Sequence, residues 1–233
     1  MSSSKRAAGY RAAEFVTSGQ RVGLGTGSTV FFLLERLGER VRDEGLEIVC
    51  VPTSIDTENK ARELGIPLST LDDVERLDVT IDGADEIDPR FSMIKGGGGA
   101  LLREKVVASV SEHVVIVVGP NKVVDTLGTT FDLPVEVVPF ARATVERAVR
   151  LLGGEPSVRR GEGDRATLTD NGNEILDVHF ASGIDDPSAL ELALDRIPGV
   201  VESGLFIGLA HTLVVGHDDG ATDVRKPMTS SLS

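Results

Sequence analysis

The sequence has few of the residues that are typical of exported, membrane-bound or disulfide-stabilised proteins. It contains one cysteine in 233 residues, which excludes an internal disulfide and favours a reducing, cytoplasmic location. That cysteine, Cys50, lies in the apolar run 48–51, so a buried core residue is a better interpretation than a nucleophile. No apolar run approaches the roughly 20 residues that span a bilayer, and no apolar signal core follows residues 1–6. We therefore expect a cytoplasmic protein with no membrane partner.

Positive charge is also scarce. Lys and Arg number 24 against 37 Asp and Glu, which gives a net charge of −13 and argues against nucleic acid as the main partner. Six of the basic residues are lysine and the rest are arginine. An acidic chain with so little lysine is typical either of a salt-loaded cytoplasm or of an ordinary solvated surface, and both interpretations stay open. In about 1 M salt the Debye length is about 3 Å, so such a surface would scarcely repel an anionic substrate.

The first half of the chain alternates short β-branched runs with helical patterns. The patterns predict strands over 22–24, 47–51, 78–81 and 114–118, and helices over 30–37, 55–64 and 100–110. This alternation is typical of an α/β fold with a mostly parallel sheet and helices on both faces. We expect a Rossmann-like catalytic domain over 1–130, completed by about 205–225, where 212–215 is a further apolar strand.

After about residue 128 the pattern changes to that of an α+β unit. It predicts a strand over 135–138, a helix over 141–152, two strands around the Asn-Gly turn at 170–173, a helix over 187–196 and a strand near 200–201. Asp186 is placed to cap the second helix. The order βαββαβ predicts a smaller ferredoxin-like α+β domain over 131–204. The two ends, 2–4 and 229–233, are expected to be frayed.

The turn over 23–29 is the first candidate site. Its glycines allow a ligand to approach the backbone, and the N–H groups of a starting helix with the hydroxyls of Ser28 and Thr29 can bind an anion. The turn does not match the dinucleotide-binding motif, because the third glycine of that motif would fall on Ser28. It does not match a P-loop either, because the lysine of the P-loop motif does not follow. A plain strand-to-helix turn is the alternative.

The acidic turn 82–86 is the second candidate. Three carboxylates in five residues after a strand would repel one another if they were buried together, so a site there must separate their ionisation or use them for hydroxyl binding and proton transfer. A metal site is the rival interpretation, although no histidine is near in the sequence. A solvated acidic turn is the other alternative.

The segment 95–105 is the third candidate, with Lys95, four consecutive glycines over 96–99, and Glu104 early in the next helix. Four glycines are entropically costly to order in a mere connector. Glu104 alone could also be a helix-dipole or ion-pair partner. These turns and Lys122 all follow the carboxyl ends of predicted parallel strands, where open α/β sheets bind ligands. Together, and without a cofactor motif, they favour proton chemistry on a small phosphorylated polyol.

The sequence resembles the type A ribose-5-phosphate isomerases from about Lys5 to Gly216. The segments that carry the resemblance are 23–29, 82–87, 95–105, 133–139, 169–173 and 198–206. The resemblance implies interconversion of D-ribose 5-phosphate and D-ribulose 5-phosphate through a 1,2-enediolate, in the pentose phosphate pathway, without metal or other cofactor. It also implies a homodimer or homotetramer.

Residue by residue, the resemblance implies Glu104 as the general base, with Asp82, Asp85 and Lys95 as further catalytic residues. The substrate-binding residues that it implies are Lys5, Thr26, Gly27, Ser28, Thr29, Asp82, Gly83, Ala84, Asp85, Lys95, Gly96, Gly97, Gly98 and Lys122. The turn 119–121 departs from the small polar turn expected before Lys122. A sugar-phosphate-sensing module and a CoA-transferase-like or lactone-hydrolysing enzyme are the alternative classes, and the combination of the second and third candidates favours the isomerase.

Overall fold

The structure, a computed structural model, describes residues 3–227. The first part of the chain contains α1 (Ser3–Ala13), β1 (Arg21–Leu24), α2 (Ser28–Asp43), β2 (Val49–Pro52), α3 (Ile55–Glu63), β3 (Val79–Gly83), β4 (Glu86–Ile87), β5 (Met93–Ile94), α4 (Leu101–Ser109), β6 (Val114–Val118) and the 3₁₀ turn η1 (Pro120–Lys122). The second part contains β7 (Leu133–Val137), η2 (Pro139–Ala141), α5 (Arg142–Leu151), β8 (Glu155–Val158), η3 (Glu162–Asp164), β9 (Glu174–His179), α6 (Pro187–Asp195), β10 (Val200–Ser203), β11 (Leu205–Phe206), β12 (Thr212–Gly216) and β13 (Thr222–Arg225).

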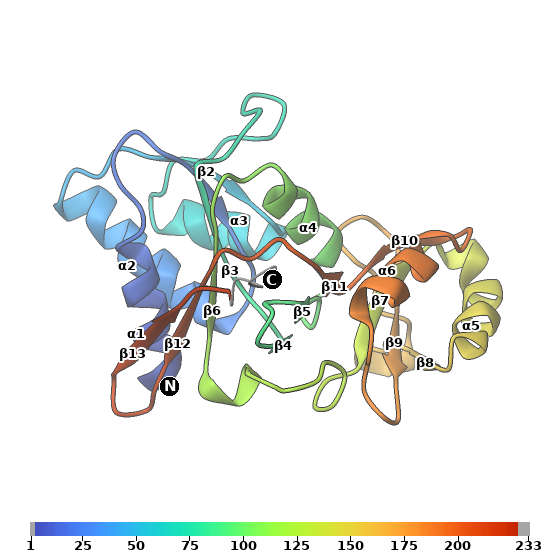
Figure 1. Cartoon of the computed structure of the whole chain (residues 1–233). Helices are drawn as coiled ribbons and strands as arrows, with labels where there is room; N and C mark the ends of the chain where they lie inside the picture. The colour runs from blue at the N-terminus through green and yellow to red at the C-terminus, as the bar shows by residue number, and fades with distance from the viewer. Residues whose placement is uncertain (1–2, 228–233) are drawn as a thin grey trace.

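The larger sheet has six strands in the order β13-β12-β6-β3-β1-β2 (Figure 1). All neighbours are parallel except the β12–β13 pair. The chain runs from β1 outward to β2 and then returns to the other side of β1 as β3, so the strand order reverses between β1 and β3. Ligands of open α/β sheets bind at the carboxyl ends of the strands beside such a reversal.

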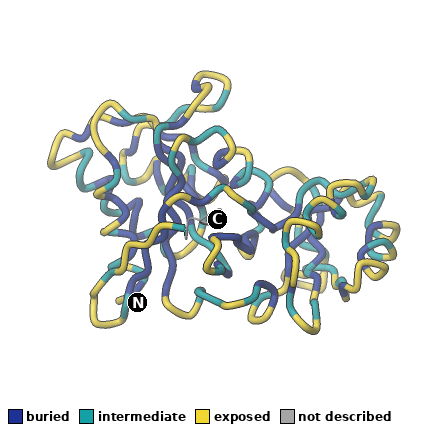
Figure 2. The backbone as a smooth tube through the Cα atoms, in the orientation of Figure 1, coloured by how far each residue is buried: buried dark blue, intermediate teal, exposed yellow. Residues whose placement is uncertain are grey.

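Helices cover both faces of this sheet. On β6, Val115 and Val117 belong to the core formed with α1 and α2, whereas Val114, Ile116 and Val118 belong to the core formed with α4. Successive strand residues point to opposite faces, so a strand buried on both sides is apolar throughout. Figure 2 shows these strands as a buried centre between more exposed helices. The predicted mostly parallel α/β fold is confirmed.

Helix α1 was not predicted, and its small residues explain why. Ala8, Ala12 and Ala13 are fully buried, and a Cβ added to Gly9 would lie 2.8 Å from the Cβ of Phe32 on α2. The two helices therefore approach closely through small side chains, and α1 lacks the large apolar residues at helical spacing that indicate an amphipathic helix. Ser3 and Ser4, expected to be frayed, belong to this helix; Ser2 and 229–233 lie outside the described residues.

The smaller sheet has the order β10-β7-β9-β8, with antiparallel neighbours throughout, as in a ferredoxin-like βαββαβ unit. The Asp186 side chain accepts a hydrogen bond from the N–H of Ala189 at 3.0 Å, as expected for the cap of α6. All four strands lie within the domain proposed over 131–204.

One strand prediction in this unit was wrong. β9 follows the Asn-Gly turn as expected, but its partner β8 ends at Val158, and the residues just before the turn form an isolated Leu168–Glu174 bridge instead of a strand. The physical reason is a buried carboxylate on β7. Glu136 Oε1 accepts hydrogen bonds from Thr169 Oγ1 (2.8 Å), Asn171 Nδ2 (3.2 Å) and Asn173 Nδ2 (2.8 Å), which hold the turn in place of a strand ladder.

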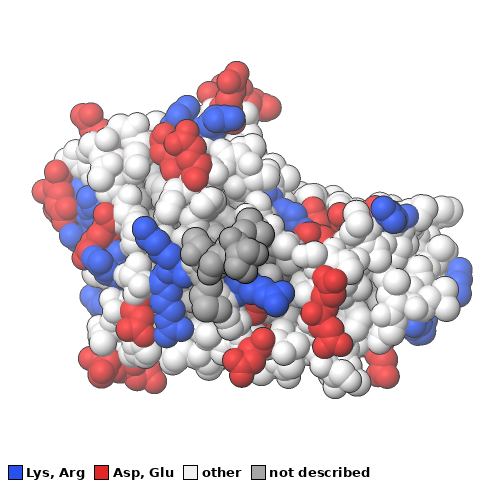
Figure 3. Space-filling model, in the orientation of Figure 1, with Lys and Arg blue, Asp and Glu red and all other residues white. Residues whose placement is uncertain are grey.

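Three further findings bear on the composition. Cys50 on β2 is fully buried, as expected, and burial raises the pKa of its thiol to about 12. Acidic and basic side chains are interspersed over the face seen in Figure 3. Within residues 3–227, no helix combines the length and the apolar character needed to cross a bilayer.

Candidate active site

A cavity of about 380 Å³ lies at the carboxyl ends of β1, β3 and β6, beside the reversal in strand order. Its lining includes every predicted substrate-binding residue except Asp82, which is buried and contacts Lys95. The lining residues that were not predicted are Ser4, Val30, Val117, Val118, Gly119 and Asn121. The three candidate turns and the segment before Lys122 therefore meet in one cavity.

The first turn leaves no room for side chains between β1 and β3. A Cβ on Gly25 would lie 2.1 Å from Asp82 Oδ1, so only glycine fits there. The next residue, Thr26, donates its backbone N–H to the same Oδ1 at 3.0 Å. Its hydroxyl lies 2.8 Å from both Thr53 Oγ1 and Ser54 Oγ, two residues at the start of α3 that the sequence analysis missed. The turn is thus fixed on two sides before α2 begins.

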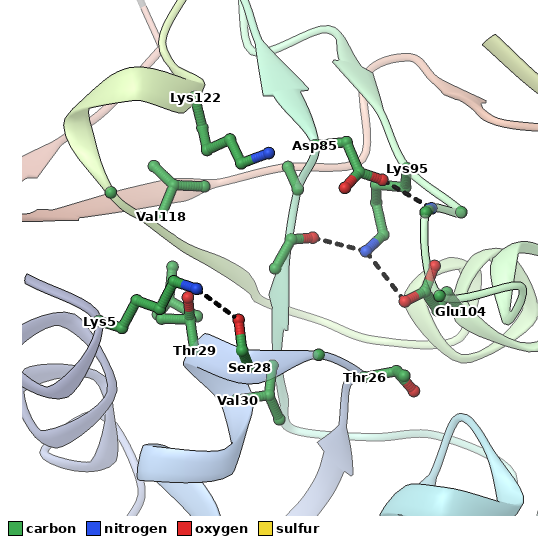
Figure 4. Close-up of a pocket in the computed structure, with 18 of the residues that line it drawn as sticks. Lys5, Thr26, Ser28, Thr29, Val30, Asp85, Lys95, Glu104, Val118 and Lys122 are labelled. Carbon is green, nitrogen blue, oxygen red and sulfur yellow. Dashed lines mark hydrogen bonds and ion pairs between the residues drawn. The ribbon is translucent and has the colours of Figure 1, made fainter. Parts of the chain in front are cut away.

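Lys95 forms the centre of a buried charge cluster, and Figure 4 shows its ammonium directed toward Glu104. Its Nζ lies 3.1 Å from Asp82 Oδ2 and 3.4 Å from Glu104 Oε1, and it donates a hydrogen bond to the Gly83 carbonyl at 2.5 Å. The side chains of Lys95, Asp82 and Glu104 are all at most 5% exposed. Burial lowers the pKa of Lys95, but the surrounding carboxylates outweigh it and hold that pKa above its ordinary value. The ammonium therefore stays charged.

Glu104 lies in the first turn of α4 and has one carboxylate oxygen unused. Its Oε2 is buried and has no hydrogen-bond partner among the described residues. Burial, and next the charge of Asp82, raise the pKa of Glu104 to about 8 against the opposing effect of Lys95. Burial also raises the pKa of Asp82. Of the two carboxyls, Glu104 takes the proton, because Asp82 accepts hydrogen bonds from two backbone N–H groups that favour its charged form.

The glycine segment follows Lys95 along the same wall of the cavity. The N–H of Gly97 donates to Asp85 Oδ2 at 2.7 Å, and a Cβ on Gly97 would lie only 2.7 Å from Asp85 Oδ1. The opposite side of the segment contacts Arg159, which follows β8 of the smaller sheet and which no motif indicates. The Asp85 side chain and the Gly97 backbone therefore hold each other in position.

Lys5 and Lys122 give the cavity a second, cationic end. Lys5, on α1, donates to Ser28 Oγ at 2.9 Å, and Lys122 comes from η1. Figure 4 shows both side chains lining the cavity, on the other side from Glu104 and Lys95. The cavity thus has one end suited to an anion and one end with an acid–base group.

The acidic turn has an ammonium group where the alternative interpretation would put a metal ion. Among residues 3–227, no group of three or more His, Cys, Asp or Glu side chains is arranged to hold a metal ion. The position between Asp82 and Glu104, where a cation would lie, is taken by the ammonium of Lys95.

Comparison with known proteins decides the family. The model of the family ribose 5-phosphate isomerase A (phosphoriboisomerase A) matches residues 49–220. Ribose-5-phosphate isomerase A of Thermosynechococcus vestitus is 52% identical over 225 residues, covering 95% of each chain. The chain belongs to the ribose 5-phosphate isomerase A family. A second relative, the ribose-5-phosphate isomerase A of Roseobacter denitrificans, is 51% identical over 222 residues, covering 92% of this chain and 84% of the relative.

Solved structures of the family agree with this fold. Ribose 5-phosphate isomerase A of Methanocaldococcus jannaschii is 39% identical with a TM-score of 0.90, covering 95% of this chain and 97% of that one. A D-ribose-5-phosphate isomerase solved in complex with phospho-erythronic acid is 36% identical with a TM-score of 0.92 and the same coverage. The family expected from the sequence is confirmed.

Proposed function

We propose that this isomerase interconverts D-ribose 5-phosphate and D-ribulose 5-phosphate, with Glu104 as the general base. The observation that carries the proposal is the buried Glu104 carboxyl, which has Lys95 beside it and whose Oε2 has no partner among residues 3–227. The other end of the same cavity holds Lys5 and Lys122. The proposed substrate has the same polarity, with a phosphate at one end and an acidic C–H next to a carbonyl at the other.

The phosphate is proposed to bind between Lys5, Ser28 and Lys122. Two ammonium groups, a hydroxyl and the uncapped N-terminus of α2 face this region, and helix N-termini favour phosphate. The open-chain sugar then extends toward Lys95 and Glu104. In this pose the phosphate contacts hold C1 and C2 beside the acid–base group.

The chemistry begins when ionised Glu104 takes the proton from C2. The electrons of the C–H bond form the C1–C2 double bond, and the aldehyde oxygen O1 becomes negative. A proton moves from O2 to O1, a step for which Asp85 is the available carboxylate on the cavity wall. Glu104 then returns its proton to C1, which leaves the ketone at C2 and regenerates the carboxylate.

Two features of the site suit these proton-transfer steps. A general base works best when its pKa lies near the working pH, and contributes typically 10²–10⁴-fold; the pKa of Glu104, about 8, meets that condition. Lys95 remains cationic because Asp82 lies against it, so it can stabilise the enediolate oxygens. Preorganised donors of this kind contribute about 3–4 kcal/mol each.

The experiment mixes the purified protein with ribose 5-phosphate and follows formation of the ketose. The alternatives predict other results: a sensing module would bind the sugar phosphate without turnover, and a lactone hydrolase would leave it unchanged. Glu104→Gln is expected to bind phospho-erythronic acid like the wild type but to lose at least 100-fold in kcat. Near-native turnover of this variant would remove Glu104 from the role.

The enzyme is proposed to act in the cytoplasm, in the pentose phosphate pathway, as a homodimer or homotetramer. The single buried cysteine supports a reducing compartment. Phe140 and Leu151 of the smaller domain are 100% and 89% exposed, which supports self-association through that domain. Light scattering of the wild type and of Phe140→Asp tests the assembly; a monomeric wild type would contradict it.

A further inference from the structure

Arg159 reaches from the smaller domain to the glycine segment of the active site. It follows β8, and its Nη1 donates to the Gly96 carbonyl at 2.8 Å and to the Gly97 carbonyl at 3.1 Å. The other side of the guanidinium pairs with Asp177 on β9: Nε donates to Oδ2 at 2.9 Å, and Nη2 donates to Oδ1. The side chains of Arg159 and Asp177 are only 16% and 23% exposed.

The position of this guanidinium is fixed by the smaller sheet. Asp177 forms a two-point pair with it, the geometry in which Arg–carboxylate pairs are strongest. The backbone of Arg159 is held as well, since its N–H donates to Ile175 O at 2.8 Å and its carbonyl accepts from Thr167 N at 2.9 Å. Arg159 therefore presents donors to the glycine segment from a rigid support.

The geometry of the peptide bond links the contacts of Arg159 to the N–H groups on the cavity side of the glycine segment. In a trans peptide the C=O and the following N–H point in opposite directions, and the described chain contains no cis peptide. Because the Gly96 carbonyl points to Arg159, the Gly97 N–H points away from it, and it donates to Asp85 at 2.7 Å. The Gly97 carbonyl also points to Arg159, so the Gly98 N–H of the same peptide points away from Arg159. Gly98 lines the cavity, so this N–H lies on the cavity side.

The glycine segment needs such a support. Glycine has no side chain to restrict its backbone and loses more conformational freedom on ordering than any other residue. Within the segment, the Gly99 N–H donates to the Gly96 carbonyl at 2.9 Å, which closes a turn but does not fix the Gly97–Gly98 peptide. Arg159 contacts the carbonyl of that peptide directly.

We propose that Arg159 is a positioning residue for the isomerisation: through the Gly96 and Gly97 carbonyls it aims the Gly98 N–H at the enediolate oxygen and holds Asp85 for proton transfer. Arg159 acts through the backbone and does not touch the substrate. The inference rests on the proposed function. It predicts that losing the guanidinium lowers kcat, because the aimed N–H acts on charge that develops in the transition state.

The test measures kcat and KM of Arg159→Gln against a matched control. The control is Arg142→Gln, which breaks another Arg–carboxylate pair next to the smaller sheet, that with Glu174 at 3.0 Å; among the described residues, Arg142 pairs with Glu174 and Glu146 and has no hydrogen bond to the glycine segment. Arg159→Gln is expected to lose at least tenfold in kcat with less than a threefold change in KM, and to bind phospho-erythronic acid at least tenfold more weakly. Arg142→Gln is expected to stay within twofold of the wild type in all three.

A second pair of variants separates positioning from loss of folding. Arg159→Lys, which keeps one charged donor, is expected to recover part of the kcat lost in Arg159→Gln. Arg159→Ala is expected to regain turnover when millimolar guanidinium is added, which a generally weakened fold would not do. An Arg159→Gln kcat within threefold of the wild type would overturn the inference, as would a loss confined to KM or no rescue in either further variant. An inactive wild type would instead contradict the proposed function.

Discussion

Replacing Glu104 by Gln should change how the stability of the protein depends on pH. The pKa of Glu104 rises from 4.5 to about 8 on folding, so the folded state keeps this proton to higher pH than the unfolded chain. The resulting stabilisation is fully present below about pH 4.5 and is lost as the pH rises through about 8. Over the whole range it amounts to about 5 kcal/mol, because one pKa unit corresponds to about 1.4 kcal/mol. Roughly 1–2 kcal/mol of it falls between about pH 7 and 9.5.

The Gln variant cannot ionise at this position, so its folding stability should not fall for this reason as the pH rises. For a chain of this size about 1 kcal/mol shifts Tm by about 2–4 °C. The Tm of Glu104→Gln relative to the wild type should therefore rise by roughly 3–6 °C from about pH 7 to 9.5. Glu63→Gln, on the exposed face of α3, provides the control and should follow the wild type. Parallel pH dependences of the Glu104 variant and the wild type would refute the assignment of the proton to Glu104.

The log of kcat/KM should rise with pH and level off above about 8, because Glu104 must be ionised to accept the C2 proton and its pKa is about 8. A profile that falls between about pH 6 and 8 would contradict this. Gly97→Ala should lower kcat at least tenfold, because its Cβ would lie 2.7 Å from Asp85 Oδ1, and circular dichroism should show the fold retained. Lys5→Met and Lys122→Met should each raise KM for ribose 5-phosphate about tenfold or more, because each variant loses a hydrogen bond to the charged phosphate. If the acidic surface reflects salt adaptation, Tm should rise from low to molar KCl; an unmoved Tm would exclude that interpretation.

The alternation of strands and helices was visible in the sequence because each buried strand is short and apolar and each helix has its own spacing. The topology rule then placed the turns after β1 and β3 at one edge of the sheet, and the structure brings them together with Lys95 and Glu104 in one cavity. The strand expected before the Asn-Gly turn was wrong because the side chain of Glu136, on a different strand, replaces the ladder. Such a contact depends on tertiary structure and leaves no local pattern.

Other features gave no local signal for a related reason. Helix α1 packs through small residues, so its apolar face is too weak to detect, although it brings Lys5 to the cavity. Arg159 lies in a charged, glycine-rich stretch that resembles an ordinary surface loop. Its importance depends on a contact with Gly96, 63 residues away in the sequence. Nearest-neighbour patterns cannot reveal such long-range partners.

The buried thiol of Cys50 has a practical consequence for studying this enzyme. Thiol reagents attack the thiolate, and a pKa of about 12 leaves almost none of it at neutral pH. A cysteine introduced at an exposed position away from the proposed oligomer contact, such as Asp72, would then be the reactive one, because Cys50 is the single cysteine of the sequence. Fluorescent or spin labels could be attached there without first replacing Cys50.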